Sequence, residues 1–110
     1  MLNQGLEFWQ YEPNLFLVPA LGPQVKRSAV LSSPAFTMLI SDLRQVFDYV
    51  IIDSPALANA ADAKIMMRTA DAGLLLTKAR STPIQAVRIS LDRVGRSLMA
   101  GVVLNEFGKI

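Results

Sequence analysis

The feature that most constrains the fold is a run of large apolar residues, Tyr49-Val50-Ile51-Ile52, followed by Asp53-Ser54-Pro55. A strand buried on both faces of a parallel sheet is apolar at successive positions, and β-branched residues favour strands. Pro55 has no N–H to donate, so it would end such a strand. The sequence therefore predicts a central strand over residues 48–53, with Asp53 at its carboxyl end.

An aspartate at this place has two interpretations. Open α/β sheets bind their ligands at the carboxyl ends of strands, where Asp53 would hold Mg²⁺ beside a nucleotide phosphate. A turn-forming or capping aspartate after any parallel strand would give the same pattern. Because apolar runs that end in aspartate are common in α/β proteins, the pattern fits both interpretations equally well.

One helix is expected directly before the central strand. Ser33-Pro34 predicts an N-cap followed by proline in the first turn. The apolar residues that follow at helical spacing are Phe36, Leu39, Ile40, Leu43 and Phe47. A helix that leads through a short connection into a buried strand is typical of a parallel sheet with crossovers.

The rest of the chain continues this alternation. Further strands are expected over residues 14–18, 73–77 and 99–104, and further helices over residues 61–69 and 84–94. Ser81-Thr82-Pro83 repeats the cap-and-proline pattern before the last helix, which Gly95 would end. An aromatic flap is expected over residues 1–12, and loops over residues 19–33 and 56–61. The predicted fold class is α/β, a parallel sheet with helices on both faces.

Composition excludes several kinds of site. Cysteine and histidine are absent, which excludes disulfides, thiolate metal sites, serine–histidine triads and most zinc sites. A net charge of +2 is too small to indicate a nucleic-acid partner or an anionic membrane. No secretory signal and no apolar run long enough to span a bilayer is present, so a cytosolic protein is expected.

Three of the expected strand ends carry polar residues: Asp53, the turn of residues 78–82, and Asn105. The carboxyl ends of parallel strands meet at one edge of a sheet, so these residues would gather there. The amide of Asn105 has both donors and an acceptor, which suits an adenine edge. On its own, however, this residue is more typical of a strand-terminal turn.

Residues from about 31 to 105 resemble the C-terminal half of the P-loop ATPase domain of bacterial tyrosine autokinases, which are related to MinD/ParA-type ATPases. The matching stretches, in chain order, are residues 31–36, 47–55, 61–63, 69–73 and 101–105. Residues 13–20 are similar to the strand and loop that precede this block. The resemblance implies that residues 1–110 form a single, incomplete domain of this fold.

The resemblance also implies roles for individual residues. Asp53 matches the catalytic Walker B aspartate, which orients Mg²⁺ through water between the β- and γ-phosphates of ATP. Asn105 matches the asparagine that contacts adenine, and Arg80 lies in the turn that borders the nucleotide, without a firm role. The family usually has a second proline after Pro55, where this chain has Ala56. That change should alter the stiffness of the loop more than its chemistry.

Three parts of the family pattern are missing. The sequence has no G-x-x-x-x-G-K-[ST] phosphate loop, no apolar run ending in Asp-x-Asp and no C-terminal tyrosine cluster. Phosphoryl transfer depends on positioning and charge stabilisation by that loop, its lysine and Mg²⁺, which one aspartate cannot replace. The implied parent function is an ATP-dependent protein-tyrosine autokinase of capsule or exopolysaccharide synthesis, and this chain alone is expected to be inactive.

Two other functions stay open: a fragment of a MinD/ParA-type ATPase, and a non-catalytic adaptor that binds an intact ATPase. For the kinase, the resemblance implies a membrane adaptor of the polysaccharide export machinery as partner, at the inner face of the cell membrane. It also places the P-loop strand beside the strand of Asp53. Without the P-loop strand, one edge of the strand that ends at Asp53 would be exposed. We therefore expect the chain to self-associate or to pair with the missing N-terminal half through this edge.

Overall fold

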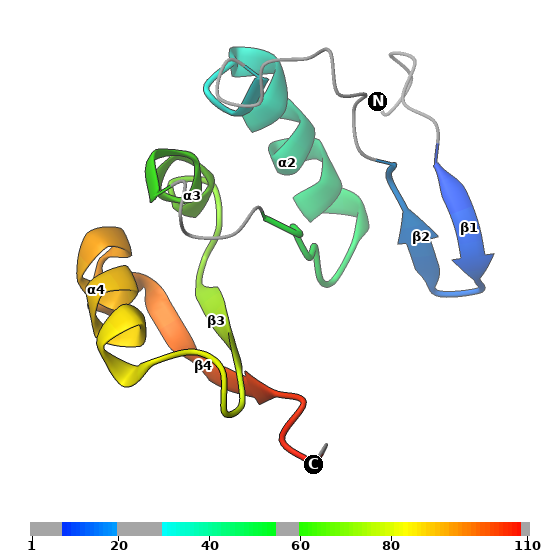
Figure 1. Cartoon of the computed structure of the whole chain (residues 1–110). Coiled ribbons are helices and arrows are strands. Elements are labelled where there is room, and N and C mark those ends of the chain that lie inside the picture. The colour runs from blue at the N-terminus through cyan, green and yellow to red at the C-terminus, as the bar shows by residue number, and fades with distance from the viewer. Residues whose placement is uncertain (1–7, 20–29, 55–59, 109–110) are drawn as a thin grey trace. The chain divides into compact units, whose positions relative to one another are not determined.

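The computed structural model describes residues 8–19, 30–54 and 60–108, and these belong to two compact units, Met1–Ile52 and Asp53–Ile110 (Figure 1). The first unit contains β1 (Trp9–Glu12), β2 (Leu15–Leu17) and α2 (Pro34–Val46). The second contains α3 (Ala60–Met67), β3 (Gly73–Lys78), α4 (Ile84–Val94), the 3₁₀ helix η2 (Arg96–Leu98) and β4 (Met99–Asn105). Pro55 and most of the loops expected over residues 19–33 and 56–61 lie outside the described residues.

The first unit begins with an antiparallel hairpin. The expected strand at residues 14–18 is confirmed as β2, but it pairs with β1, in a register of Trp9 with Leu17. The expected flap over residues 1–12 thus contains a strand. A two-residue connection permits only antiparallel pairing. The prediction that residues 14–18 belong to a parallel sheet was therefore wrong. All residues of both strands are exposed.

Helix α2 follows its sequence pattern closely. The Ser33 hydroxyl accepts a hydrogen bond from the N–H of Phe36 at 3.3 Å, and proline occupies the first turn, as expected. Ile40 and Leu43 on its apolar face are buried. The Phe47 N–H donates to the Leu43 carbonyl at 2.9 Å where the helix ends. The rings of Phe47 and Phe16 lie 5.4 Å apart, so β2 packs against this end of α2.

The main difference from the sequence prediction is that the central strand expected over residues 48–53 is not formed. Residues 47–54 form neither helix nor strand, and Tyr49 and Ile51 are 89% and 92% exposed. Strand propensity alone does not hold a strand, because its backbone groups need a neighbouring strand to pair with. In the described part of the chain, no strand is paired with this segment.

The described part of the second unit is a β-α-β arrangement, β3-α4-β4, preceded by α3, with η2 between α4 and β4. Strands β3 and β4 are parallel, and α4 connects them, as parallel neighbours require (Figure 1). The fold class is therefore α/β with a small parallel sheet, while the extended sheet with helices on both faces is not formed by the described residues. None of the helices in these residues has the length and apolarity that a membrane span needs.

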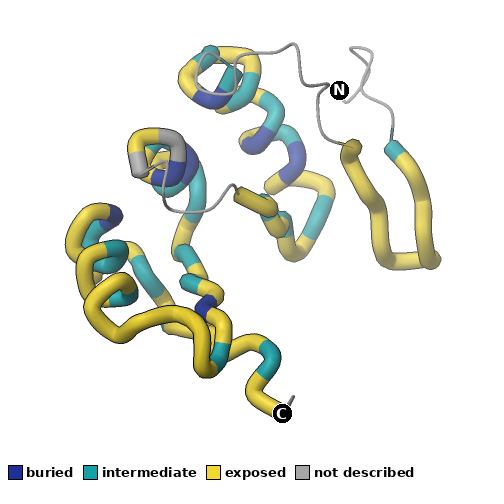
Figure 2. Tube along the Cα trace, viewed as in Figure 1, coloured by how far each residue is buried: buried dark blue, intermediate teal, exposed yellow. Residues whose placement is uncertain are grey.

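Burial in the second unit is one-sided. Among its described residues, the buried side chains are Ala63, Met66, Thr77 and Val94, from α3, β3 and α4 (Figure 2). Leu74 and Leu76, at alternate positions of β3, are 62% and 63% exposed. The strand over residues 73–77 is therefore present as predicted, but it is not buried on both faces. A Cβ on its first residue, Gly73, would lie 2.8 Å from the Met67 sulfur at the end of α3, so a larger residue would require this flexible side chain to move.

The two predicted ends of α4 had different outcomes. Gly95 ends the helix as expected, with a φ of 105° that disfavours other residues. The cap predicted at Ser81-Thr82 was wrong, because Pro83 is the N-cap residue and has no side-chain cap. The Thr82 hydroxyl instead accepts a hydrogen bond from the Lys78 N–H at 3.0 Å. This bond folds the turn that follows β3.

Candidate functional site

Two of the three polar strand ends expected from the sequence lie together. Lys78, the last residue of β3, is in register with Asn105, the last residue of β4. The Ala79 N–H donates to the Asn105 carbonyl at 2.9 Å, which continues the strand pairing by one residue. The turn of residues 78–82 and Asn105 therefore form one polar edge at the carboxyl end of the parallel pair, where α/β sheets bind ligands.

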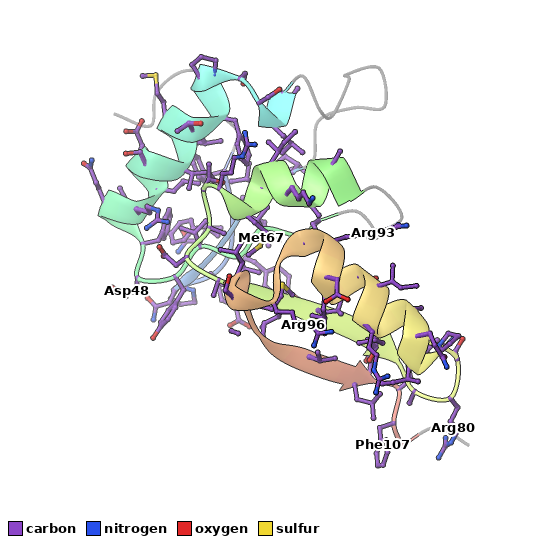
Figure 3. All side chains as sticks on the ribbon, turned by 90° about the vertical axis from the view of Figure 1, so that its left-hand side faces the viewer. Asp48, Met67, Arg80, Arg93, Arg96 and Phe107 are labelled. Carbon is purple, nitrogen blue, oxygen red and sulfur yellow. The ribbon has the colours of Figure 1, made fainter. Side chains whose placement is uncertain are left out.

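The turn after β3 is held by its own hydrogen bonds. The N–H groups of Ser81 and Thr82 both donate to the Lys78 carbonyl, at 3.2 and 3.0 Å. Arg80, which directly precedes Ser81 in this turn, has a φ of 60°, which is uncommon for a residue with a long side chain. Arg80 is exposed, and Figure 3 shows it at the same end of the strand pair as Phe107. The turn thus presents a cationic side chain at the edge.

The side chain of Asn105 is oriented by its own backbone. Its Oδ1 accepts a hydrogen bond from the Glu106 N–H at 3.0 Å. This bond fixes which end of the amide faces the backbone, and Nδ2 is the donor at the other end. This is the turn-forming role that is typical of a strand-terminal asparagine. The oxygen keeps a second lone pair and Nδ2 has two hydrogens, so the amide retains the groups needed to bind a nucleobase.

Sequence reasoning did not single out Glu106. Its φ is 58°, and its Oε2 lies 3.1 Å from Nζ of Lys78, so an ion pair joins the two strand ends. The side chains of Lys78 and Glu106 are 62% and 31% exposed. Their opposite charges are visible in the sequence, but 28 positions separate them, and only the strand register indicates that they meet.

Asp53 has no comparable placement. It is exposed and follows a segment that forms no strand, so the expected reason for its position at the edge is missing. Among the described residues, no three acidic, cysteine or histidine side chains are close enough to hold a metal ion. A single carboxylate still suits Mg²⁺ bound through water, because this ion takes one or two carboxylates and completes its ligands with water and substrate phosphates.

A second charged pair joins Asp92 of α4 to Arg96 of η2. The Asp92 carboxylate accepts a hydrogen bond from Nε of Arg96 at 2.7 Å, and this bond, with the attraction between the charges, raises the pKa of Arg96 above its ordinary value. Both side chains are more than 60% exposed, and Figure 3 shows Arg96 beside the helix. Such solvated pairs contribute little to stability, so this pair is not expected to hold α4 and η2 together.

Known proteins match most of this chain. It is 38% identical over 96 residues to the tyrosine-protein kinase CpsD of Streptococcus pneumoniae strain TIGR4. This alignment covers 84% of the chain and 42% of the pneumococcal protein. It is 37% identical over 97 residues to the succinoglycan biosynthesis transport protein ExoP of Rhizobium meliloti, covering 84% of the chain and 12% of that protein. The tyrosine-protein kinase ptk of Acinetobacter johnsonii is 27% identical over 95 residues, and the alignment covers 86% of the chain and 13% of that kinase. No family model and no solved structure matches the chain.

The chain thus spans about two fifths of the pneumococcal protein and much less of the two others. Proteins named as tyrosine kinases, and one named for succinoglycan, each match at least 84% of this chain. That resemblance is confirmed. Over most of its length, this chain is homologous to the bacterial tyrosine autokinases and corresponds to a portion of one.

Proposed function

We propose that this chain is the Walker B portion of an ATP-dependent protein-tyrosine autokinase that acts in capsule or exopolysaccharide synthesis. The observation that carries the proposal is the match of 84% of the chain to the kinase CpsD, a protein of which it spans 42%. The polar edge formed by Asn105 and the turn of residues 78–82 supports it, because a nucleotide in an α/β sheet binds at the carboxyl ends of the strands.

Each proposed site residue has one task. Asp53 would hold Mg²⁺ through water, and the ion would supply positive charge beside the phosphates of the nucleotide. Asn105 binds the adenine through its amide, with Nδ2 donating to a ring nitrogen and the remaining lone pair of Oδ1 accepting from the exocyclic amine. Arg80 borders the nucleotide and adds positive charge near it. These groups bind and orient ATP, but they do not transfer the phosphoryl group.

The proposal includes inactivity of the chain by itself. A phosphate loop with its lysine supplies most of the positioning and charge stabilisation for phosphoryl transfer, and the sequence has no G-x-x-x-x-G-K-[ST] motif. Catalysis would need that loop from another polypeptide segment. The proposed location is the cytoplasm at the inner face of the cell membrane, with a membrane adaptor of the export machinery as partner.

Calorimetry tests the nucleotide site directly. We expect weak binding of ATP–Mg²⁺ to the 110-residue chain and no detectable binding to Asp53→Ala, because the variant loses the carboxylate that orients the ion. The control is Asp92→Ala, which removes an exposed carboxylate on α4 and should leave binding unchanged. Absence of binding to the unaltered chain, or equal binding to Asp53→Ala, would contradict the proposal.

A second candidate function is an adaptor that binds an intact ATPase. It is favoured by the exposure of Leu74 and Leu76 on one face of β3, because large apolar side chains grouped on a surface often mark a contact with another protein. The test is co-elution with a purified CpsD-type kinase. Leu76→Lys should abolish co-elution if the adaptor proposal is correct, and nucleotide binding should then be absent from the isolated chain.

A further inference from the structure

The residue after Asn105 has an unusual conformation that is tied to a specific contact. Glu106 has a φ of 58°, in the left-handed region that residues with a branched or long side chain rarely occupy. In this conformation its N–H reaches Oδ1 of Asn105 at 3.0 Å, while its carboxylate lies 3.1 Å from Nζ of Lys78. Glu106 thus contacts both Asn105, the residue proposed to bind the base, and Lys78 at the end of the neighbouring strand.

We propose that Glu106 is a positioning residue: held by Lys78, it fixes the amide of Asn105 so that this edge selects adenine over guanine nucleotides. The inference rests on the proposed function, because it assigns the recognition of the base at the same site. It adds two residues, Lys78 and Glu106, to which the resemblance assigns no role.

The chemistry of the two bases explains why the amide must be fixed. Adenine presents an acceptor nitrogen beside an amine donor, so an amide with one donor and one acceptor in fixed order pairs with both atoms. Guanine presents two acceptors at the corresponding edge, N7 and O6. An amide whose oxygen is held in place therefore sets Oδ1 of Asn105 against O6 of guanine, which is repulsive.

The ion pair is what holds the amide in this orientation. Left-handed backbone at a residue other than glycine is unfavourable, so it persists only where the surroundings stabilise it. The Lys78 side chain reaches Glu106 from the in-register end of β3, and the Ala79 N–H fixes the Asn105 carbonyl from the same strand at 2.9 Å. Strand β3 therefore holds both residues of the base-binding turn.

Affinities for ATP–Mg²⁺ and GTP–Mg²⁺, measured on the full chain, test the proposal. Glu106→Gln and Lys78→Met each remove the ion pair, and each should lower the preference for ATP by about threefold, the size expected for a partly exposed pair. The exchanged pair Lys78→Glu with Glu106→Lys should restore much of the preference. Asp92→Asn is the matched control, since it breaks the ion pair on α4 in the same unit and should leave the ratio unchanged.

Nuclear magnetic resonance adds a readout that needs no nucleotide. In the unaltered chain the Glu106 amide proton should exchange slowly, because it is hydrogen-bonded to Asn105, and Lys78→Met should accelerate its exchange. Retained chemical shifts in β3 and β4 show that the variant is folded. A Glu106 amide that exchanges as fast as an exposed coil residue in the unaltered chain overturns the inference.

The outcomes separate this inference from the proposed function. Preferential ATP binding with an unchanged ratio in Glu106→Gln and Lys78→Met overturns the positioning role and leaves the Walker B proposal intact. If the unaltered chain binds ATP and GTP equally and Asp53→Ala binds neither, the positioning role is likewise overturned and the Walker B proposal stays intact. Binding of neither nucleotide by the unaltered chain overturns the proposed function, and this inference with it.

Discussion

Two apolar runs in this chain have similar sequences and different structures. Tyr49-Val50-Ile51-Ile52 precedes Asp53, and Gly101-Val102-Val103-Leu104 precedes Asn105. The second run lies in β4, paired along its length with β3. The first lies in no strand, and Ile51 is 92% exposed.

Intrinsic strand preference would predict the opposite result. The run over residues 49–52 consists of an aromatic and three β-branched residues, whereas the run over residues 101–104 contains a glycine, which weakens a strand. The difference lies in the neighbour: α4 returns the chain so that β4 lies beside β3, and the described residues provide no such neighbour for residues 49–52. Pairing therefore outweighs propensity in this chain.

Proline substitution is the strongest way to break this comparison. In a parallel pair, alternate residues of β4 bond to β3, so one of Val102→Pro and Val103→Pro must remove a donor from the pairing. That variant should be destabilised by about 1–3 kcal/mol. Hydrogen exchange of the β3 amides measures the effect in this unit.

The matched controls are Ile51→Pro and Ile52→Pro in the unpaired run. They remove no strand hydrogen bond in this structure, so β3 and β4 should keep their protection against exchange. If these two substitutions destabilise the chain as much as those in β4, then residues 49–52 are paired in solution and the comparison fails.

Self-association is the next largest effect. The exposed run over residues 49–52 offers Ile51 for burial against a second chain, and full burial of such a side chain contributes about 1.5–3 kcal/mol. Ile51→Lys should therefore weaken association by about tenfold or more, as measured by light scattering across a concentration series. Met38→Lys, an exposed position on α2, should not change it. A chain that stays monomeric at high concentration would rule out this role of the run.

A smaller effect is expected at the hydrogen bond that joins a buried side chain of β3 to the backbone of β4. Thr77 is 8% exposed, and its hydroxyl donates to the Val103 carbonyl at 3.3 Å. Thr77→Val keeps the shape and removes this bond, which should cost about 1 kcal/mol in the free energy of unfolding. Thr37→Val, at an exposed position of α2, should be near neutral in the same urea titration. Equal effects at both positions would show that the bond contributes nothing.

Local signals in the sequence predicted the elements that depend on local interactions. The capping of α2 by Ser33 and the end of α4 at Gly95 follow from hydrogen bonds within a few residues, and both are confirmed. Residues 48–53 and the two-sided burial of residues 73–77 depend on neighbours that the described residues do not provide. The sequence pattern indicates that a segment is suited to burial, but not which segment covers it.

The candidate site was predictable to the same extent. Parallel strand ends meet at one edge, so the proximity of Asn105 to the turn of residues 78–82 followed from the order of elements. The Lys78–Glu106 ion pair was not predictable, since it depends on a register that no local pattern encodes. The role of Asp53 stays a prediction that calorimetry must test.

The smallest expected effect concerns the glycine that distinguishes the paired run. A Cβ added at Gly101 meets no other atom within 4 Å, and its backbone does not require glycine. Gly101→Ala should therefore stabilise the chain by about 0.5 kcal/mol, because it reduces the entropy of the unfolded state without strain. Gly95→Ala is the contrasting control: at a φ of 105° the new side chain is strained, and the variant should be destabilised by more than the first is stabilised. Opposite signs in one denaturation series would show that β4 forms despite its glycine, through pairing with β3, and a destabilised Gly101→Ala would show instead that the close approach of another segment requires the glycine there.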